Sequence, residues 1–281
     1  MNKPVVIITG SSSGFGLLAA IEFSKQGYFV IATMRDLHKQ EHILQRIELN
    51  TMEDHIRFAE VDVTNSNSLD SLKNILHDVG HVDVLINNAG FATGGFAEEV
   101  SLQEYKSQFE TNFFGVIEIT KLVLPFMRKQ GNGKILNLSS ISGQIGFPGL
   151  SPYVSSKFAL EGWSECLRLE VNPFGIDVAL IEPGSFQTNI WSSGKKVAEK
   201  SLLPSSPYHQ IMKKIEAKLE KDKEKYGDPM EVVRLLVNLA EAPKLTKLRY
   251  PIGQGVKTGI LLKSMVPWKI WEKFVLRAIG R

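Results

Sequence analysis

Short apolar runs, many of them β-branched, alternate with longer segments of helical period along nearly the whole chain. The strand candidates are 5–10, 28–33, 56–63, 82–90, 133–140, 176–184 and 249–253, and the helix candidates are 14–26, 66–79, 101–130 and 153–172. Several strand candidates are continuously apolar, which is typical of strands that helices cover on both faces. The alternation predicts one α/β domain over residues 1–281, built on a doubly wound parallel sheet of about seven strands flanked by helices.

Two segments depart from this pattern. Residues 185–226 begin as a loop and end in a charged run, and an excursion of this length predicts a substrate loop or lid. The tail, residues 257–281, has apolar residues at helical spacing beside lysines and arginines, and the chain from Lys244 onward carries nine basic residues against one acid, Glu272. Amphipathic helices usually bury their apolar face on protein, so we expect packing on the body or a sister subunit first. The second expectation is that the tail covers the substrate entrance, and the third is that it lies on an anionic membrane surface.

Composition narrows the class of protein. An apolar fraction of 43% with 22% charged residues is ordinary for a globular domain. No apolar run approaches the ~20 residues that span a bilayer, and no signal peptide is expected at the start. One cysteine, Cys166, excludes an internal disulfide framework, so we expect a buried thiol and a cytoplasmic protein. The tail has basic residues among aromatic ones, but no nucleic-acid-binding module accompanies them.

A glycine-rich turn follows the first strand in the sequence TGSSSGFG, where Gly10, Gly14 and Gly16 open the next helix. Glycines suit such a turn because backbone N–H groups must approach a diphosphate closely. The partial positive charge at the helix N-terminus also favours an anion. A turn without a ligand is the alternative, but its place in a strand–helix–strand unit favours a nucleotide.

The glycine spacing becomes specific when it is combined with four further motifs. The first is the NNAG run, residues 87–90, and the second is Ser140. The third is the Tyr153-x-x-x-Lys157 pair, and the fourth is Pro183-Gly184. In this order they resemble a classical short-chain dehydrogenase/reductase over about residues 4–190, and the chain is similar to hydroxysteroid and retinol dehydrogenases. The resemblance implies a Rossmann fold, NAD(P)(H), and a homodimer or homotetramer formed through helices 101–130 and 153–172. No metal site is expected.

The end of the second strand predicts which nicotinamide nucleotide binds. An acid there holds the ribose hydroxyls, whereas a basic residue accommodates a 2′-phosphate. The chain has Arg35 at this point, and Asp36 follows one residue later, where we expect it to point away or cap the next helix. NADP(H) is therefore expected in preference to NAD(H). With the resemblance, the expected cofactor-binding residues are Gly10, Ser12, Ser13, Gly14, Phe15, Gly16, Arg35, Asp62, Val63, Asn88, Ala89, Gly90, Tyr153, Lys157, Pro183, Gly184, Phe186 and Thr188.

The chemistry is expected at Tyr153, with Lys157 one helical turn away. A free tyrosine has a pKa near ~10, and a nearby ammonium favours its ionised form. The resemblance adds Ser140, thirteen residues before the tyrosine, to orient the substrate oxygen, with Ser139 as the alternative. It also adds Asn112, which would hold a water behind the lysine as part of a proton relay.

The predicted function is hydride transfer between NADP(H) and a hydrophobic alcohol, ketone or aldehyde, with Tyr153 as general acid/base. The substrate pocket is expected to be apolar and to include Phe91, Ala92, Ile145, Phe147, Pro148, Phe186 and Trp191. A catalytically silent NADP-binding redox sensor or scaffold is the alternative from another class. Such a protein needs the glycine loop but not the four catalytic residues. An enoyl reductase is a second alternative, but it typically has a longer tyrosine–lysine spacing, so the three-residue gap in this chain disfavours it.

Overall fold

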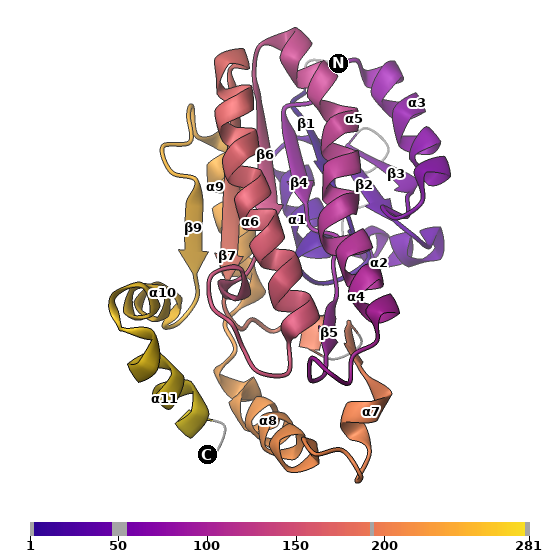
Figure 1. Cartoon of the computed structure of the whole chain (residues 1–281). Coiled ribbons are helices and arrows are strands. Elements are labelled where there is room, and N and C mark those ends of the chain that lie inside the picture. The colour runs from indigo at the N-terminus through magenta and orange to yellow at the C-terminus, as the bar shows by residue number, and fades with distance from the viewer. Residues whose placement is uncertain (1–2, 47–54, 192–193, 279–281) are drawn as a thin grey trace.

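The computed structural model describes residues 3–46, 55–191 and 194–278, and a seven-stranded parallel sheet lies at its centre (Figure 1). In spatial order the strands are β3 (Ile56–Glu60), β2 (Phe29–Met34), β1 (Val5–Ile8), β4 (Val84–Asn87), β6 (Gly133–Leu138), β7 (Ile176–Pro183) and β9 (Arg249–Ile252). The predicted seven-stranded, single-domain Rossmann fold is confirmed.

The strand order reverses beside the first strand. β1 pairs with β2 on one side and with β4 on the other, so the chain winds outward in both directions from this point. In open α/β sheets, ligands bind outside the carboxyl ends of the strands at such a reversal. The fold therefore places the glycine loop, which follows Ile8, at the expected ligand crevice.

Helices cover both faces of the sheet, and alternate residues of β1 enter two separate cores. Val6 and Ile8 pack into one core with α1 and α9, whereas Val5 and Ile7 pack into the other with α3, α5 and α6. Strands buried on both faces account for the continuously apolar sequence. The helices of these layers are α1 (Gly14–Lys25), α2 (Glu41–Leu44), α3 (Leu69–Val79), α4 (Leu102–Phe109), α5 (Gly115–Gln130), α6 (Ser151–Val171) and α9 (Pro229–Glu241).

The segment predicted as one helix over 101–130 is interrupted. It begins with a capping box between Ser101 and Glu104, runs through α4, and passes through a single π-helical turn, Glu110–Phe114, into α5. π-Helical turns inside helices frequently mark functional sites. This turn contains Asn112, whose side chain is buried.

The described residues of the excursion, 185–191 and 194–226, include a short strand and two α-helices. β8 (Lys195–Val197) pairs in parallel with β5 (Ala92–Gly94) in a second sheet, and α7 (Glu199–Leu202) and α8 (His209–Asp222) follow. Figure 1 shows α7 and α8 at the end of the molecule where the strands of the main sheet terminate. The excursion therefore lies on the ligand side of the fold.

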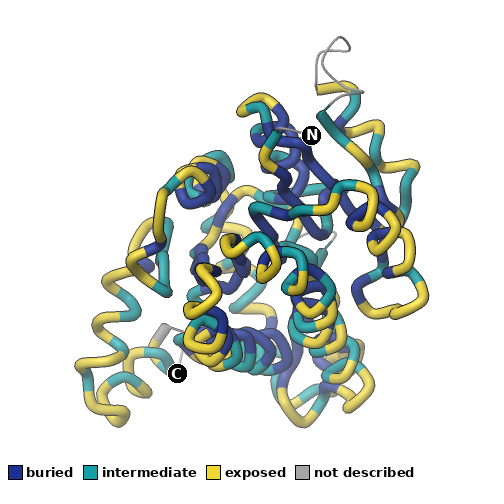
Figure 2. The backbone as a smooth tube through the Cα atoms, turned by 90° about the horizontal axis from the view of Figure 1, so that it is seen from above, coloured by how far each residue is buried: buried dark blue, intermediate teal, exposed yellow. Residues whose placement is uncertain are grey.

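The tail forms two helices, α10 (Val256–Met265) and α11 (Trp268–Ala278). Seen from above, they lie at one side of the molecule and are mostly exposed (Figure 2). Within the described residues, no helix is both long and apolar enough to cross a membrane.

Candidate active site

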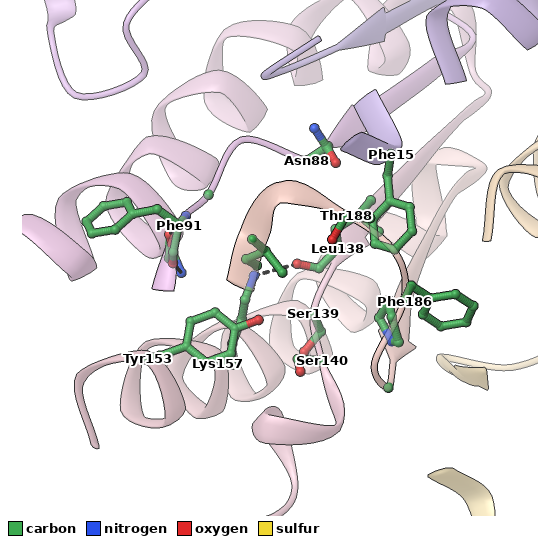
Figure 3. A pocket seen from close by; sticks show the side chains of 15 residues that line it. Phe15, Asn88, Phe91, Leu138, Ser139, Ser140, Tyr153, Lys157, Phe186 and Thr188 are labelled. Carbon is green, nitrogen blue, oxygen red and sulfur yellow. Dashed lines mark hydrogen bonds between the residues drawn. The ribbon is translucent and has the colours of Figure 1, made fainter. Parts of the chain in front are cut away.

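Tyr153 and Lys157 lie one turn apart on α6 and are both almost fully buried, with exposed fractions of 3% and 6%. The Lys157 Nζ donates a 2.6 Å hydrogen bond to the carbonyl oxygen of Leu138, at the end of β6. The same Nζ lies 5.7 Å from the centroid of the tyrosine ring. Figure 3 shows both side chains directed into the same pocket. The helix and the adjacent strand end together fix the ammonium beside the phenol.

The two candidate serines have different partners. The Ser140 hydroxyl hydrogen-bonds the side chain of Tyr153 and also accepts from the Ser142 N–H at 3.1 Å. The Ser139 hydroxyl instead donates to Glu161 Oε1 at 2.5 Å. Although both serines line the pocket, the contact with the tyrosine favours Ser140 for orienting a substrate oxygen, and the role stays a prediction.

Burial controls the ionisation of the pair. Burial raises the pKa of the Tyr153 phenol to about 12, against the opposing hydrogen bond from Ser140. Burial lowers the pKa of the Lys157 ammonium to about 8, and the negative charge of Glu161 partly offsets this change. In this structure desolvation therefore outweighs the pKa-lowering effect that we expected from the lysine. Tyr153 holds its proton at neutral pH.

Asn112 acts as a clamp on the loop after β4. Its Oδ1 accepts the Phe91 N–H at 3.2 Å, and its Nδ2 donates to the Phe91 carbonyl oxygen at 3.0 Å. Its Nδ2 also lies 3.4 Å from the Ser156 hydroxyl. The side-chain amide thus positions Phe91, and the expected proton-relay role of Asn112 stays a prediction.

The glycine loop fits a diphosphate. Gly10 and Gly14 have φ angles of +69° and +57°, which side chains rarely adopt. A Cβ on Gly10 would lie 2.8 Å from the Cα of Ala89, and a Cβ on Gly16 would lie 2.4 Å from Asn88 Nδ2. Ser13 precedes α1 without a side-chain cap, so the first-turn N–H groups are left for another acceptor. The loop therefore has the close backbone approach and the donors that such an anion requires.

The NNAG run holds this loop in place. The Thr9 hydroxyl accepts the N–H groups of Asn88 and Ala89 at 2.9 and 3.0 Å. Asn88 Nδ2 in turn donates to the carbonyl oxygens of Thr9 and Gly10. Asn88 and Gly90 also line the pocket, whereas Ala89 contacts Gly10 from behind.

Arg35 is exposed at the carboxyl end of β2, next to the strand that leads into the glycine loop. The Asp36 side chain accepts the His38 N–H at 3.1 Å and caps a 3₁₀ turn, as expected. Asp62 is held by Thr64, whose N–H and hydroxyl both donate to Oδ1, and Val63 lies against Gly115. Arg35 therefore lies at the strand end where the ribose-recognising residue of a Rossmann fold is expected, and its contact with a 2′-phosphate stays a prediction.

One pocket, with a cavity volume of about 70 Å³, brings together many of the predicted residues. Eleven predicted site residues line it: Phe15, Asn88, Gly90, Asn112, Ser140, Tyr153, Lys157, Pro183, Gly184, Phe186 and Thr188. Phe91, Leu138, Ser139 and Ile190 complete the lining. In Figure 3, Phe91 lies on one side of the tyrosine–lysine pair, and Phe15 and Phe186 lie on the other. The remaining predicted residues, among them Arg35 and Asp62, lie outside this pocket.

The expected substrate residues divide into two groups. Phe91 and Phe186 line the pocket, and Phe186 packs edge-on against Phe15 with ring centroids 5.8 Å apart. The others do not line it: Ala92 and Ile145 are buried, and Phe147 and Pro148 lie on the loop before α6. The side chain of Trp191 lies outside the described part of the structure.

A buried carboxyl cluster behind the pocket was not predicted. Arg249 donates from Nε to Glu161 Oε2 at 2.9 Å and lies 3.8 Å from Glu182 Oε1. The Nη2 of Arg249 donates to Oε2 of the more exposed Glu165 at 2.9 Å. Burial raises the pKa of both inner carboxyls, that of Glu182 to about 7. Glu161 lies one turn beyond Lys157 on α6, a spacing that could have signalled the cluster.

The expectation of a buried cysteine is wrong. Cys166 is exposed on α6, in a stripe with Phe158, Gly162 and Leu169 at three- and four-residue spacing. The apolar composition of the segment did not distinguish a core face from an exposed apolar stripe. Large apolar side chains left exposed on a helix mark a candidate subunit interface.

Comparisons with known proteins agree with this geometry. Residues 4–198 match the short chain dehydrogenase family. An uncharacterized oxidoreductase, YusZ of Bacillus subtilis, is 48% identical over 279 residues, which is 99% of each chain. A 3-ketodihydrosphingosine reductase of Bacteroides thetaiotaomicron is 44% identical over 71% of this chain and 70% of that protein. Human retinol dehydrogenase 8 is 38% identical over 70% of this chain and 63% of that protein.

Solved structures are also similar over most of the chain. A short-chain dehydrogenase from Streptomyces avermitilis has a TM-score of 0.83 at 32% identity, covering 97% of each chain. ElxO with NADP bound has a TM-score of 0.73 at 28% identity, covering 91% of this chain and 99% of that one. With the Tyr153, Lys157 and glycine-loop geometry described above, these matches show that the chain is an oxidoreductase of the classical short-chain dehydrogenase/reductase family.

Proposed function

We propose that the protein is an NADP(H)-dependent reductase of lipophilic ketones or aldehydes, which also oxidises the matching alcohols. The observation that carries this proposal is the contact between Tyr153 and Ser140 in a pocket that Lys157 also lines. The pocket adjoins the glycine loop, because Phe15 in the first turn of α1 lines it. The arrangement brings a proton donor, an oxygen-orienting hydroxyl and a cation to one point.

NADPH would supply the hydride. The glycine loop and the first turn of α1 would hold its diphosphate, and Arg35 would pair with the 2′-phosphate. Lys157 and Thr188 would bind the nicotinamide end, as the family resemblance implies. Support for NADP(H) comes from the basic residue at the end of β2 and from the NADP bound to ElxO.

The reduction uses the proton that Tyr153 holds at neutral pH. Ser140 donates a hydrogen bond to the substrate carbonyl oxygen and draws it toward the phenol. As the carbonyl carbon accepts hydride, its oxygen gains electron density and takes the proton from the Tyr153 hydroxyl. The phenolate left behind is stabilised by the Lys157 ammonium and regains its proton from solvent. The raised tyrosine pKa keeps the phenol protonated before the reaction, as a proton donor requires.

A lipophilic substrate is supported by the apolar lining. Phe15, Phe91, Leu138, Phe186 and Ile190 contribute aromatic or aliphatic side chains, and the polar groups gather at the reacting end. Pockets of this kind bind mainly by apolar burial with a few orienting polar contacts. The names of the similar proteins, a 3-ketodihydrosphingosine reductase and a retinol dehydrogenase, fit this class.

The proposal is tested by an NADPH-oxidation screen over ketones and aldehydes of increasing chain length. Rising kcat/KM with chain length is expected, because each buried methylene adds roughly 0.8 kcal/mol of binding. No oxidation of NADPH with any carbonyl compound would favour the silent NADP-binding protein.

A further inference from the structure

The tail, α10 and α11, presents large apolar side chains to solvent. Six of them are between 49% and 72% exposed: Leu261, Leu262, Met265, Trp268, Ile270 and Phe274. Figure 2 shows the tail as a mostly exposed projection at the side of the molecule. Monomeric proteins rarely leave so many large apolar side chains together in water, which indicates a binding surface.

The same two helices are strongly basic. Their described residues include five cations and one acid, the cations being Lys257, Lys263, Lys269, Lys273 and Arg277. On α11, Ile270, Trp271, Phe274 and Val275 lie on one side of the helix, whereas Lys269, Lys273 and Arg277 recur every four residues along its flank. Lys263 Nζ lies 4.9 Å from the Trp268 ring centroid, which joins the two helices. Aromatic residues beside a row of cations are typical of helices that lie at an anionic lipid surface.

The tail is attached beside the candidate active site. Val256, 2% exposed, packs against Gly184, where an added Cβ would lie 2.6 Å from Val256 Cγ2. Gly259 faces Ile141 and Ile145, since a Cβ there would lie 3.8 Å from both Cδ1 atoms. Gly184 directly follows Pro183 at the end of β7, and Ile141 and Ile145 follow Ser140 in the chain. The first turns of α10 therefore tie the tail to the pocket wall, while α11 projects away from it (Figure 1).

Three occupants could cover the apolar surface. The body of the same chain does not, because the six side chains are exposed. A second copy meeting this surface symmetrically would set five cations against the same five cations, and an isologous contact always pairs a patch with itself. An anionic bilayer offers phosphate groups to the cations and an interfacial region to the aromatic rings. Helices of 10 and 11 residues are too short to span it and would lie in its surface.

We propose that α10 and α11 form a membrane-surface anchor that binds anionic phospholipid. Because the first turns of α10 pack against the pocket wall, the anchor would hold the pocket close to the bilayer. In combination with the proposed reductase activity, on which this second clause rests, the enzyme would take its lipophilic substrate from the lipid phase. The sequence alone favours packing on protein for this tail, and the proposal assigns α11 to a membrane surface instead.

Sedimentation of the full-length protein with vesicles tests the anchor. The vesicles contain phosphatidylcholine alone or phosphatidylcholine with 30% phosphatidylglycerol, at low salt and at 0.5 M NaCl. We expect pelleting with the anionic vesicles at low salt, at least tenfold weaker binding to the neutral ones, and loss of binding at high salt. Tryptophan emission should shift to shorter wavelength on binding. Absence of pelleting with anionic vesicles at low salt would overturn the proposal.

Two variants identify the surface. The first is the double variant Lys269→Glu with Lys273→Glu, and the second is the double variant Trp268→Ser with Phe274→Ser. Each should weaken binding to anionic vesicles by tenfold or more. The matched control is Lys25→Glu with Lys129→Glu, which reverses two exposed lysines in the last turns of α1 and α5, at the end of the molecule where the strands of the main sheet begin. Equal loss in the control and the tail variants would show that total charge, not the tail, drives binding, and would overturn the proposal.

Two further measurements separate this proposal from its rivals. Light scattering without lipid should give one molar mass for wild type and tail variants; a fall in mass in the variants would assign the surface to a second copy and contradict the anchor. Reduction of a water-soluble ketone by NADPH should be unchanged in the tail variants. Loss of vesicle binding with that turnover intact would leave the proposed function standing, whereas absent turnover with normal vesicle binding would refute only the proposed function.

Discussion

The Ser139 hydroxyl donates a 2.5 Å hydrogen bond to Glu161 Oε1 and is thereby directed to the buried carboxyl cluster. Its neighbour Ser140 bonds the phenol of Tyr153 instead. These two adjacent residues, which directly follow β6, thus serve two different networks.

Ser140→Ala and Ser139→Ala should therefore have different effects. Loss of the Ser140 hydroxyl removes the group that orients the substrate oxygen, and kcat should fall roughly 10²-fold or more, in the range of other oxygen-binding donors. Loss of the Ser139 hydroxyl leaves a buried acceptor unpaired and should cost about 1–3 kcal/mol of stability. Steady-state kinetics and thermal unfolding of both variants check this. Equal kinetic defects would contradict the assignment.

Arg35→Ala should remove the preference for NADPH over NADH. Arg35 is exposed at the end of β2, and Asp36 is occupied as a cap, so the guanidinium is the group available for a 2′-phosphate. The expected result is a rise of about tenfold in KM for NADPH with little change for NADH. Lys39→Ala, in the following turn, is the matched control. An unchanged ratio of the two cofactors' kcat/KM values would sink the NADP(H) assignment.

Glu182→Gln should stabilise the protein increasingly as the pH rises. Burial raises the folded-state pKa of Glu182 to about 7, so the native state holds a proton that the unfolded state releases from about pH 4.5 upward. Wild-type stability therefore falls between about pH 4.5 and 7, and the full loss, on the order of 1–3 kcal/mol, remains above pH 7. The uncharged glutamine has no such dependence.

Thermal melts from pH 4.5 to 8.5 measure the difference between variant and wild type. That difference should grow with pH to about pH 7 and then level off. Glu165→Gln changes the exposed carboxyl that binds the same Arg249 and is the matched control. If the difference for Glu182→Gln does not change with pH, the raised pKa of the buried Glu182 carboxyl is contradicted.

The fold could be predicted from sequence because its signals are local. Strands buried on both faces gave continuously apolar runs, and the glycine loop and Tyr153-x-x-x-Lys157 kept their motif spacing. The pairing of β5 with β8 could not be predicted, since strands of three residues carry almost no periodicity. The contact of Arg249 with Glu161 joins residues 88 positions apart, so neither segment alone identifies its partner.

The exposed stripe on α6 predicts a subunit interface there. Phe158 and Leu169 are 46% and 74% exposed in the single chain, with Cys166 between them. If α6 packs against a second subunit, the native thiol should react with a disulfide reagent at least tenfold more slowly than in the Leu169→Glu variant. Light scattering should show a dimer or tetramer for wild type and a smaller species for the variant. A monomeric wild type with a fast-reacting thiol would contradict the interface.

The central claim is that the Tyr153 hydroxyl is the proton donor, and Tyr153→Phe tests it most directly because only that oxygen is lost. The measurement pairs turnover of the best ketone from the screen with NADPH affinity, determined by fluorescence titration. We predict a fall in kcat of roughly 10³-fold or more with the Kd for NADPH unchanged within about twofold. Turnover within tenfold of wild type, with NADPH bound normally, would contradict the claim.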